Sequence, residues 1–317
     1  MHESDSDSSW RIVRAAADAA ARLTEATQPA AFATDGDGNL RPVAIGDPAS
    51  ILIWRPGAGW QSILPLTDPR APLIDLYAPV CSATAARPIT LGHLGQSLDG
   101  FIATHAGESR WVTGEQNMIH MHRLRALCDA VMVGAGTVAI DDPQLTTRLV
   151  PGPNPLRVVI DPDRRLEATY RVFAEPSADT LYVCARSLVR SGEERVGHAM
   201  IVGLDAAPDS GIDLAALLRL LRARGCARVF VEGGGVTVSD FLAANLLDRL
   251  HIAIAPLLIG DGRPAIRIPP RAALGDCHRP RYRVFRMGED ILFDCDLRAD
   301  RLEPGDTDPD AAVTRVI

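Results

Sequence analysis

The chain has 317 residues, a net charge of −7 at pH 7 and an apolar fraction of 47%. This length allows one large domain or two small ones, with enough apolar surface for a core. The negative charge argues against a nucleic-acid binder that works by neutralising phosphates. The chain contains no lysine, and all 33 basic residues are arginine. This composition excludes Schiff-base and phosphate-loop lysines and leaves arginine to bind anions.

The cysteines and the start of the chain bear on the cellular compartment. No two cysteines form a Cys-x-x-Cys pair, and several lie in apolar runs, which predicts buried free thiols in a reducing compartment. Residues 1–5 are polar and acidic, unlike a signal peptide. No apolar run is long enough to cross a membrane. We therefore expect a cytoplasmic protein without nucleic-acid or membrane partners.

Residues 1–86 form an N-terminal extension that carries no motif connected to chemistry. A helix is expected over residues 10–27, a short strand over residues 51–54 and a second helix around residues 73–77. Prolines and glycines between residues 56 and 79 favour a small irregular cap over an autonomous domain.

Apolar runs of strand length become regular after residue 87. They occupy residues 89–94, 130–133, 156–160, 181–184, 200–202, 229–231, 250–255, 284–286 and 291–295, with helical patterns at 115–128, 212–224 and 237–247. Strands that alternate with helices predict an α/β fold, with a mixed, mostly parallel sheet and helices on both faces. The last two strands are expected to form an antiparallel hairpin at the sheet edge. Residues 299–317 are expected to be a flexible acidic tail.

A glycine turn, Glu232-Gly233-Gly234-Gly235, follows the apolar run at residues 229–231. Thr237 or Ser239 is expected to cap the next helix, with Asp240 in its first turn. Exposed N–H groups and the helix dipole would suit a dinucleotide pyrophosphate. A turn without a ligand is the alternative, because the Gly-x-Gly-x-x-Gly pattern is absent.

A second glycine turn, Gly134-Ala135-Gly136-Thr137, ends the run at residues 130–133, and two aspartates follow it. Asp141 is the better candidate for a functional carboxylate, because Asp142 precedes a proline and suits a turn.

The sequence does not predict a metal site. His120 and His122 would point to different faces of their helix, so the two imidazoles and Cys128 are not expected to share a metal. Surface histidines, or core histidines with hydrogen-bond partners, are expected instead.

Several motifs occur in one consistent order over residues 88–297. They lie at residues 97–100 (Ser-Leu-Asp-Gly), 107–111 (Gly-Glu-Ser-Arg-Trp), 124–125, 136–138, 141–146, 157–161, 231–234 and 255–260. Together they resemble the C-terminal reductase domain of the RibD family, within the dihydrofolate-reductase-like superfamily. The resemblance implies a three-layer fold over residues 87–298. It also implies NADPH-dependent reduction of a ribosylaminopyrimidine 5′-phosphate, in which hydride transfer turns the opened ribose into a ribityl chain.

The same resemblance assigns roles to individual residues. The nicotinamide half of NADPH would contact Gly95, Trp111, Thr137 and Asp141. The cofactor phosphates would contact Gly234, Gly235, Val236, Thr237, Val238, Ser239 and Asp240. The substrate would contact Ser109, Arg125, Leu145, Arg148 and Glu232, with both arginines able to clamp its phosphate. Asp141 and His93 are the candidate catalytic residues.

The chain departs from the family at three places. His93 stands where the family has a lysine near the substrate, so we expect a rate that falls between pH 6 and pH 8 as His93 loses its proton. Pro162 stands where a polar residue often meets the 2′-phosphate, and Arg164 or Arg165 would replace that contact. Residues 1–85 lack the His-x-Glu and Pro-Cys-x-x-Cys signature of a zinc deaminase.

Two alternatives stay open. A pterin reductase resembling dihydrofolate reductase would need an apolar pocket with one carboxylate. A non-catalytic nucleotide-binding protein would bind NADPH without turnover. For the leading interpretation, the resemblance implies a homodimer near the edge strands at residues 284–286 and 291–295, which would otherwise leave a sheet edge open.

Overall fold

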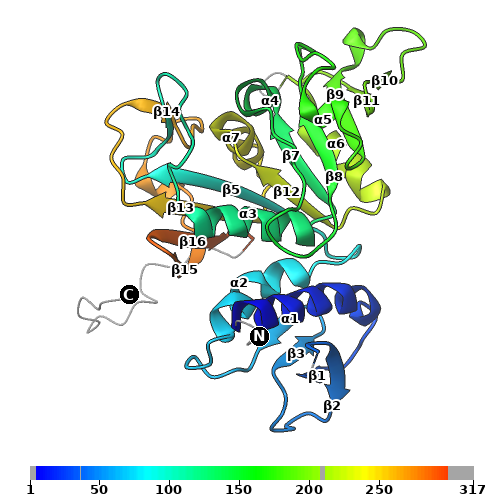
Figure 1. Ribbon diagram of the computed structural model, residues 1–317, viewed down its shortest axis with the longest axis vertical. Helices are drawn as coiled ribbons and strands as arrows, with labels where there is room; N and C mark the ends of the chain where they lie inside the picture. The colour runs from blue at the N-terminus through cyan, green and yellow to red at the C-terminus, as the bar shows by residue number, and fades with distance from the viewer. Residues whose placement is uncertain (1–4, 36, 208–210, 299–317) are drawn as a thin grey trace.

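The computed structural model describes residues 5–35, 37–207 and 211–298. A small N-terminal unit lies beside a larger unit that is built on a long twisted sheet (Figure 1). The acidic tail expected at residues 299–317 lies outside the described residues.

The N-terminal unit is a regular α/β arrangement, and the expectation of an irregular cap was wrong. Its antiparallel sheet has the strand order β2-β1-β3-β4. Two of the prolines lie where a missing N–H costs little, and a third, Pro79, lies inside α2 although proline disfavours a helix interior. Pro56 lies in the turn between β3 and β4, and Pro72 lies in the first turn of α2. The elements are α1 (Asp5–Ala20), a 3-10 turn (Ala21–Leu23), β1 (Ala30–Thr34), β2 (Leu40–Val43), β3 (Leu52–Arg55), β4 (Gly59–Ser62) and α2 (Ala71–Cys81).

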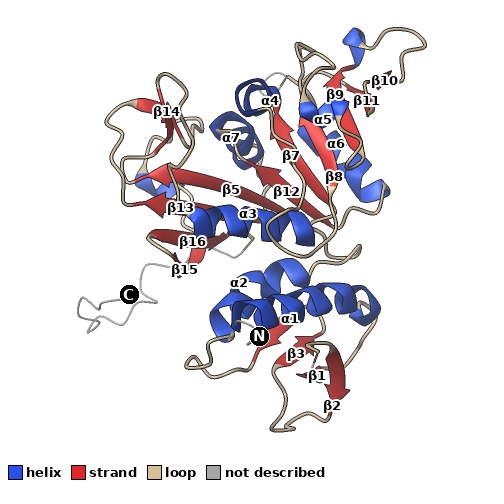
Figure 2. Ribbon diagram, in the orientation of Figure 1, coloured by secondary structure: helices blue, strands red, loops and turns tan. Residues whose placement is uncertain are grey.

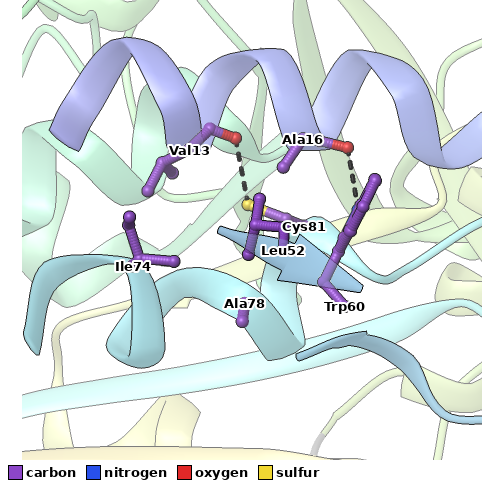
Figure 3. Close-up of a pocket in the computed structure, with 7 residues that line it drawn as sticks. All are labelled: Val13, Ala16, Leu52, Trp60, Ile74, Ala78 and Cys81. Atoms are coloured by element: carbon purple, nitrogen blue, oxygen red, sulfur yellow. Dashed lines mark hydrogen bonds between the residues drawn. The ribbon is translucent and has the colours of Figure 1, made fainter. Parts of the chain in front are cut away.

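The N-terminal unit encloses a small apolar cavity between α1, α2 and its own sheet (Figure 3). Trp60 Nε1 donates to the carbonyl of Ala16 at 2.9 Å, and the Cys81 thiol donates to the carbonyl of Val13 at 3.3 Å. Because the polar groups of the lining residues bond to one another, we interpret this cavity as a packing gap between the helices and the sheet. The lining residues are Val13, Ala16, Leu52, Trp60, Ile74, Ala78 and Cys81.

The larger unit contains a ten-stranded sheet of order β10-β11-β9-β8-β7-β12-β5-β13-β16-β15. The seven strands from β11 to β13 in this order are parallel, as the sequence predicted. Strands β15 and β16 form the expected antiparallel hairpin at one edge. The strands are β5 (Ile89–Ser97), β7 (Ala130–Gly134), β8 (Leu156–Ile160), β9 (Thr180–Ala185), β10 (Arg195–Val196), β11 (Ala199–Leu204), β12 (Arg228–Glu232), β13 (Arg249–Ala255), β15 (Arg281–Met287) and β16 (Asp290–Asp296).

Helices cover both faces of this sheet, so the larger unit has three layers (Figure 2). Side chains alternate along β12: Phe230 joins the core cluster that includes Leu124 of α3, and Val229 and Val231 join the cluster that includes Phe241 of α7. This alternation is what a strand buried on both faces requires. The helices are α3 (Glu115–Leu127), α4 (Ala135–Asp141), α5 (Arg171–Ala174), α6 (Leu214–Ala223) and α7 (Gly235–Ala243), with short 3-10 turns at Arg186–Leu188 and Leu274–Asp276.

Two short strands that are distant in the sequence, β6 (Phe101–Thr104) and β14 (Gly262–Pro264), form an antiparallel pair separate from the main sheet. The sequence analysis missed both strands because neither is long enough to show a periodic pattern. The loop of residues 105–114 leads from this pair to α3 (Figure 1).

The N-terminal unit packs directly on α3. Trp10 of α1 donates from Nε1 to the carbonyl of Pro151 at 2.9 Å, and the Tyr77 hydroxyl of α2 lies 2.6 Å from His120 Nδ1 of α3. One hydrophobic cluster contains Trp10, Tyr77 and Leu124. The extension therefore shares a core with the larger unit and buries the outer side of α3.

Candidate active site

The carboxyl ends of the neighbouring strands β7 and β12 both turn into helices through glycines, and α4 and α7 start side by side (Figure 1). A Cβ on Gly134 would lie 2.4 Å from Thr237 Oγ1, and a Cβ on Gly234 would lie 2.8 Å from Thr137 Oγ1. Any larger residue at either glycine would collide with the threonine of the opposite helix. The two turns can therefore meet only because both residues are glycine.

Helix α7 begins earlier than expected, and the capping prediction for Thr237 and Ser239 was wrong. Gly234 is the N-cap, with φ +68°, and both hydroxyl residues lie inside the helix. Glycine adopts this left-handed conformation without strain, so the helix starts directly after the turn. The Ser239 hydroxyl instead accepts a hydrogen bond from the backbone N–H of Arg267 at 2.8 Å.

The residues expected to hold the cofactor phosphates differ in exposure. Gly234 and Asp240 are half-buried and Val236 is 76% exposed. The other members are buried: Gly235, Thr237, Val238 and Ser239. Contacts from this helix to an anion would thus use backbone N–H groups of its first turn rather than side chains.

Arg125 and Glu232 form a buried ion pair that joins α3 to the carboxyl end of β12. Arg125 Nε donates to Glu232 Oε2 at 2.7 Å and Nη2 donates to Oε1 at 2.5 Å. Its third donor group, Nη1, bonds to the carbonyl of Thr146 at 3.1 Å. Because the guanidinium is committed to these partners, Arg125 orients the site, and Arg148 is left as the phosphate candidate of the expected clamp.

Arg148 lies on a loop that side chains of α3 hold by hydrogen bonds. Its backbone N–H donates to His122 Nδ1 at 2.9 Å, and its Nη1 donates to Thr146 Oγ1 at 2.6 Å. Partial burial, with the neighbouring cations Arg125 and Arg171, lowers the pKa of Arg148. An anion placed beside this guanidinium would relieve that repulsion. Leu145, also expected at the substrate, is buried in the same loop with φ +55°.

Asp141 ends α4 and faces the loop from the β6–β14 pair. Burial raises the pKa of its carboxyl, while a hydrogen bond from Ser109 and the positive charge of Arg263 lower it. The structure thus brings Ser109 and Asp141 together. It also adds Arg263 of β14, which the sequence analysis missed because no motif or periodicity marks so short a strand.

Trp111 and Gly95 flank the same edge in different ways. Trp111 is 75% exposed and has φ +71°, so it is not a core aromatic. Gly95 lies on β5 beneath Thr113, and a Cβ there would lie 2.8 Å from Thr113 Cγ2. Thr113 and Asn117, which also approaches Gly95, were not among the expected site residues.

His93 corrects one expectation. Its side chain is 1% exposed, and its Nε2 lies 2.9 Å from Asn117 Oδ1 beneath α3. Burial, with the nearby His251, lowers the pKa of His93 to about 3. The imidazole is therefore neutral from pH 6 to pH 8, and it lies inside the core. This burial argues against a rate that follows the protonation of His93 in that range.

The remaining histidines of α3 are core residues with partners. His120 lies between Tyr77 and His251, and His122 accepts from the loop of Arg148. Burial and the charges of Arg125 and Arg148 lower the pKa of His122 to about 4. Within residues 5–35, 37–207 and 211–298, no group of three potential ligands could hold a metal.

Arg164 is occupied by neighbouring groups. Its guanidinium pairs with Glu193 and donates to the carbonyl of Leu188 at 2.6 Å. Arg165 has a side chain that is 66% exposed, near Asp161 and Asp163. Of the two arginines considered for a 2′-phosphate, Arg165 is therefore the more accessible.

The described part of the chain contains no helix that is both long enough and apolar enough to cross a membrane.

The fold and the edge described above define an α/β protein whose sheet edge is lined by two glycine turns and a loop that carries Arg148. Residues 91–278 match the family model described as the RibD C-terminal domain. The chain belongs to this family, as its motif series indicated.

Curated relatives agree with this placement. The chain is 33% identical over 214 residues to the 2,5-diamino-6-ribosylamino-4(3H)-pyrimidinone 5′-phosphate reductase of Methanothermobacter thermautotrophicus, covering 66% of this chain and 97% of that protein. It is 30% identical over 211 residues to the riboflavin biosynthesis protein RibD of Aquifex aeolicus, where it spans only 58% of the relative.

Solved structures share the fold. The deaminase/5-amino-6-(5-phosphoribosylamino)uracil reductase of Thermotoga maritima superposes with a TM-score of 0.58 at 27% identity, covering 73% of this chain and 62% of that one. The riboflavin biosynthesis reductase Rib7 of Saccharomyces cerevisiae gives a TM-score of 0.53 at 20% identity, covering 66% and 90%, and supports the fold alone.

Proposed function

We propose that this protein is an NADPH-dependent reductase that acts on a ribosylaminopyrimidine 5′-phosphate of riboflavin biosynthesis. The observation that carries the proposal is the meeting of two features at one sheet edge. The two glycine turns, which contact each other, begin α4 and α7. The loop that contains Thr146 and Arg148, here called the arginine loop, is held by the Arg125–Glu232 pair on the α3 side. The similarity to an archaeal reductase along nearly its full length supports the same substrate class.

The glycine turns fit a nicotinamide dinucleotide. Gly136 and Gly233 border open space, because a Cβ at either position would meet nothing within 4 Å. The N–H groups at the start of α7 would bind the pyrophosphate, and Thr137 and Trp111 would flank the nicotinamide. Arg165 would meet the 2′-phosphate, which a guanidinium binds better than a ribose hydroxyl.

When bound at this edge, NADPH would supply the hydride that reduces the opened ribose. Arg148 holds the substrate phosphate, and Glu232 fixes Arg125 under the substrate. Asp141, whose pKa is raised by burial and whose carboxyl accepts a hydrogen bond from Ser109, would hold or deliver a proton to the reacting substrate. Trp111 limits the access of water to the site, and hydride transfer benefits from this exclusion of water.

The test of the function is NADPH oxidation against a panel. We expect turnover with 2,5-diamino-6-ribosylamino-4(3H)-pyrimidinone 5′-phosphate or its deaminated uracil counterpart, and weaker binding of NADH than of NADPH. Turnover of dihydrofolate alone would favour the pterin reductase. NADPH binding without turnover of any compound would favour the non-catalytic alternative. Equal affinities for NADH and NADPH would contradict the proposal that Arg165 binds the 2′-phosphate.

Replacing Arg148 should weaken substrate binding selectively. Arg148→Ala removes a charge-assisted contact to phosphate, which contributes about 1.5–3 kcal/mol, so KM for the substrate should rise about 10- to 100-fold while the Kd of NADPH stays constant. The matched control is Arg55→Ala on β3, an exposed arginine bonded to Gln61. Equal kinetics in both variants would place Arg148 on an ordinary surface loop.

Asp141→Asn should keep the fold and NADPH binding but lower kcat by about 100-fold or more, the usual contribution of a positioned acid or base. Because burial raises the pKa of Asp141, the folded state holds this proton more tightly than the unfolded chain. Ionised Asp141 therefore costs stability at pH 7, and this cost disappears as the pH falls through the raised folded pKa toward the unfolded value near 3.8. The variant should have an equal or higher Tm at pH 7 and the same Tm at pH 3.

Asp161→Asn is the contrasting control. Its buried carboxylate accepts from the backbone N–H groups of Arg165 and Leu166 and from the Tyr182 hydroxyl. We expect a clearly lower Tm there. A similar loss of Tm in Asp141→Asn would make Asp141 a structural residue.

We propose a homodimer that covers the β15 edge, in the cytoplasm, where the six unpaired cysteines of the chain are stable. Strand β15 bonds to β16 on one side, and Tyr282 on it is 58% exposed. An open edge of seven residues invites pairing. Light scattering at micromolar concentration should give twice the 34.0 kDa chain mass; a monomer mass would contradict the proposal.

A further inference from the structure

A directed chain of hydrogen bonds runs from the core to the site edge through α3. The His93 imidazole lies 2.9 Å from Asn117 Oδ1, and Asn117 Nδ2 donates to Thr113 Oγ1 at 2.8 Å. His93 and Asn117 are 1% and 2% exposed. Because an amide oxygen only accepts, His93 Nε2 must carry its proton. The amide nitrogen only donates, so Thr113 is the acceptor at the end of the chain.

The Thr113 hydroxyl keeps its own proton free for another partner. Between residues 37 and 207 and in the other described segments, Thr113 Oγ1 makes one side-chain hydrogen bond, the one from Asn117. It does not cap α3, because the N-cap is Gly114 and no side chain bonds there. Thr113 is half-buried. A hydroxyl that accepts from Asn117 can therefore still donate its own proton to a second partner.

Thr113 lies on the face of the sheet that α3 covers. It lies over Gly95, whose missing Cβ allows the approach. Gly95 lies two residues beyond His93 on β5, and His93 is paired in register with Glu232 of β12. At about 3.3 Å per residue, Gly95 lies roughly 7 Å farther toward the carboxyl edge than Glu232, and Thr113 contacts the sheet at that level. Arg125 approaches the same face from α3, while α7 covers the opposite face.

We propose that the Thr113 hydroxyl donates a hydrogen bond to an oxygen of the sugar part of the substrate, with Asn117 and His93 as positioning residues. The proposal rests on the reductase function above. An opened ribose presents carbonyl and hydroxyl oxygens as acceptors, and a neutral donor suits them. In this chain, the buried His93 would thus affect the substrate by orienting Asn117, which in turn orients Thr113, and not by carrying a charge.

The experiment compares Thr113→Val with Thr113→Ser. Valine has nearly the shape of threonine but no hydroxyl, and serine keeps the hydroxyl. We expect KM for the ribosylaminopyrimidine 5′-phosphate to rise about 5- to 10-fold in Thr113→Val, as the loss of one neutral hydrogen bond implies. Thr113→Ser should stay within about twofold of wild type and keep its Tm, and the Kd of NADPH should be unchanged in both variants. Thr113→Val leaves the buried Asn117 Nδ2 donor without its acceptor, so its Tm should fall.

Asn117→Asp tests the direction of the chain. A carboxylate can only accept, so it would draw the Thr113 proton back toward α3 and away from the substrate. We expect the same rise in KM as in Thr113→Val, although Thr113 is intact. An unchanged KM in this variant would overturn the positioning role of Asn117 and His93. A Thr113→Val enzyme with wild-type KM, or a Thr113→Ser enzyme as impaired as Thr113→Val, would overturn the substrate contact.

These outcomes are separate from failure of the proposed function. If wild-type protein turns over no ribosylaminopyrimidine phosphate, the function and the Thr113 contact fall together. If wild-type protein is active and Thr113→Val matches it, only the Thr113 contact falls.

Discussion

The buried pair of Arg125 and Glu232 is the interaction on which the site depends. It joins a helix from one face of the sheet to the carboxyl end of the central strand β12, and its third bond holds the Thr146 carbonyl of the arginine loop. Two charges removed from water are stable only when their donors and acceptors are satisfied, as they are here. Removing one partner would leave the other charge uncompensated, at a cost of about 3–5 kcal/mol.

The second constraint is that α3 is covered on both sides. Its inner side meets the sheet through Asn117 and Arg125, and its outer side meets the N-terminal unit through Tyr77 and His120. One direction of donation satisfies a buried series of hydrogen bonds that ends on the Asp294 carboxylate. Tyr77 donates to His120, His120 to His251, and His251 to Asp294. The N-terminal extension thus completes the burial of the helix that carries the site residues.

Glycines set the third constraint, because they decide how closely the two halves of the edge approach. Gly134 and Gly234 admit the threonines of the opposite helices, and Gly235 packs with its Cα against the carbonyls of Pro264 and Ala265. The starts of α4 and α7 and the β14 segment are therefore fixed relative to one another by close contacts of small residues, which leave less room for movement than contacts between long side chains.

Sequence patterns alone were enough to locate the nine long strands of the main sheet, to predict that most of them run parallel, and to indicate the family. Periodicity and motif spacing are local properties of the chain, so they can be read without the fold. Its motifs also named Glu232, Arg125 and Asp141. Tertiary structure alone decided what these side chains do: that Arg125 is used up by Glu232, that Arg164 pairs with Glu193, and that His93 is buried and uncharged. Thr113, Asn117 and Arg263 join the site through contacts between distant segments, and burial and pairing of that kind depend on which segments meet, which no local pattern records.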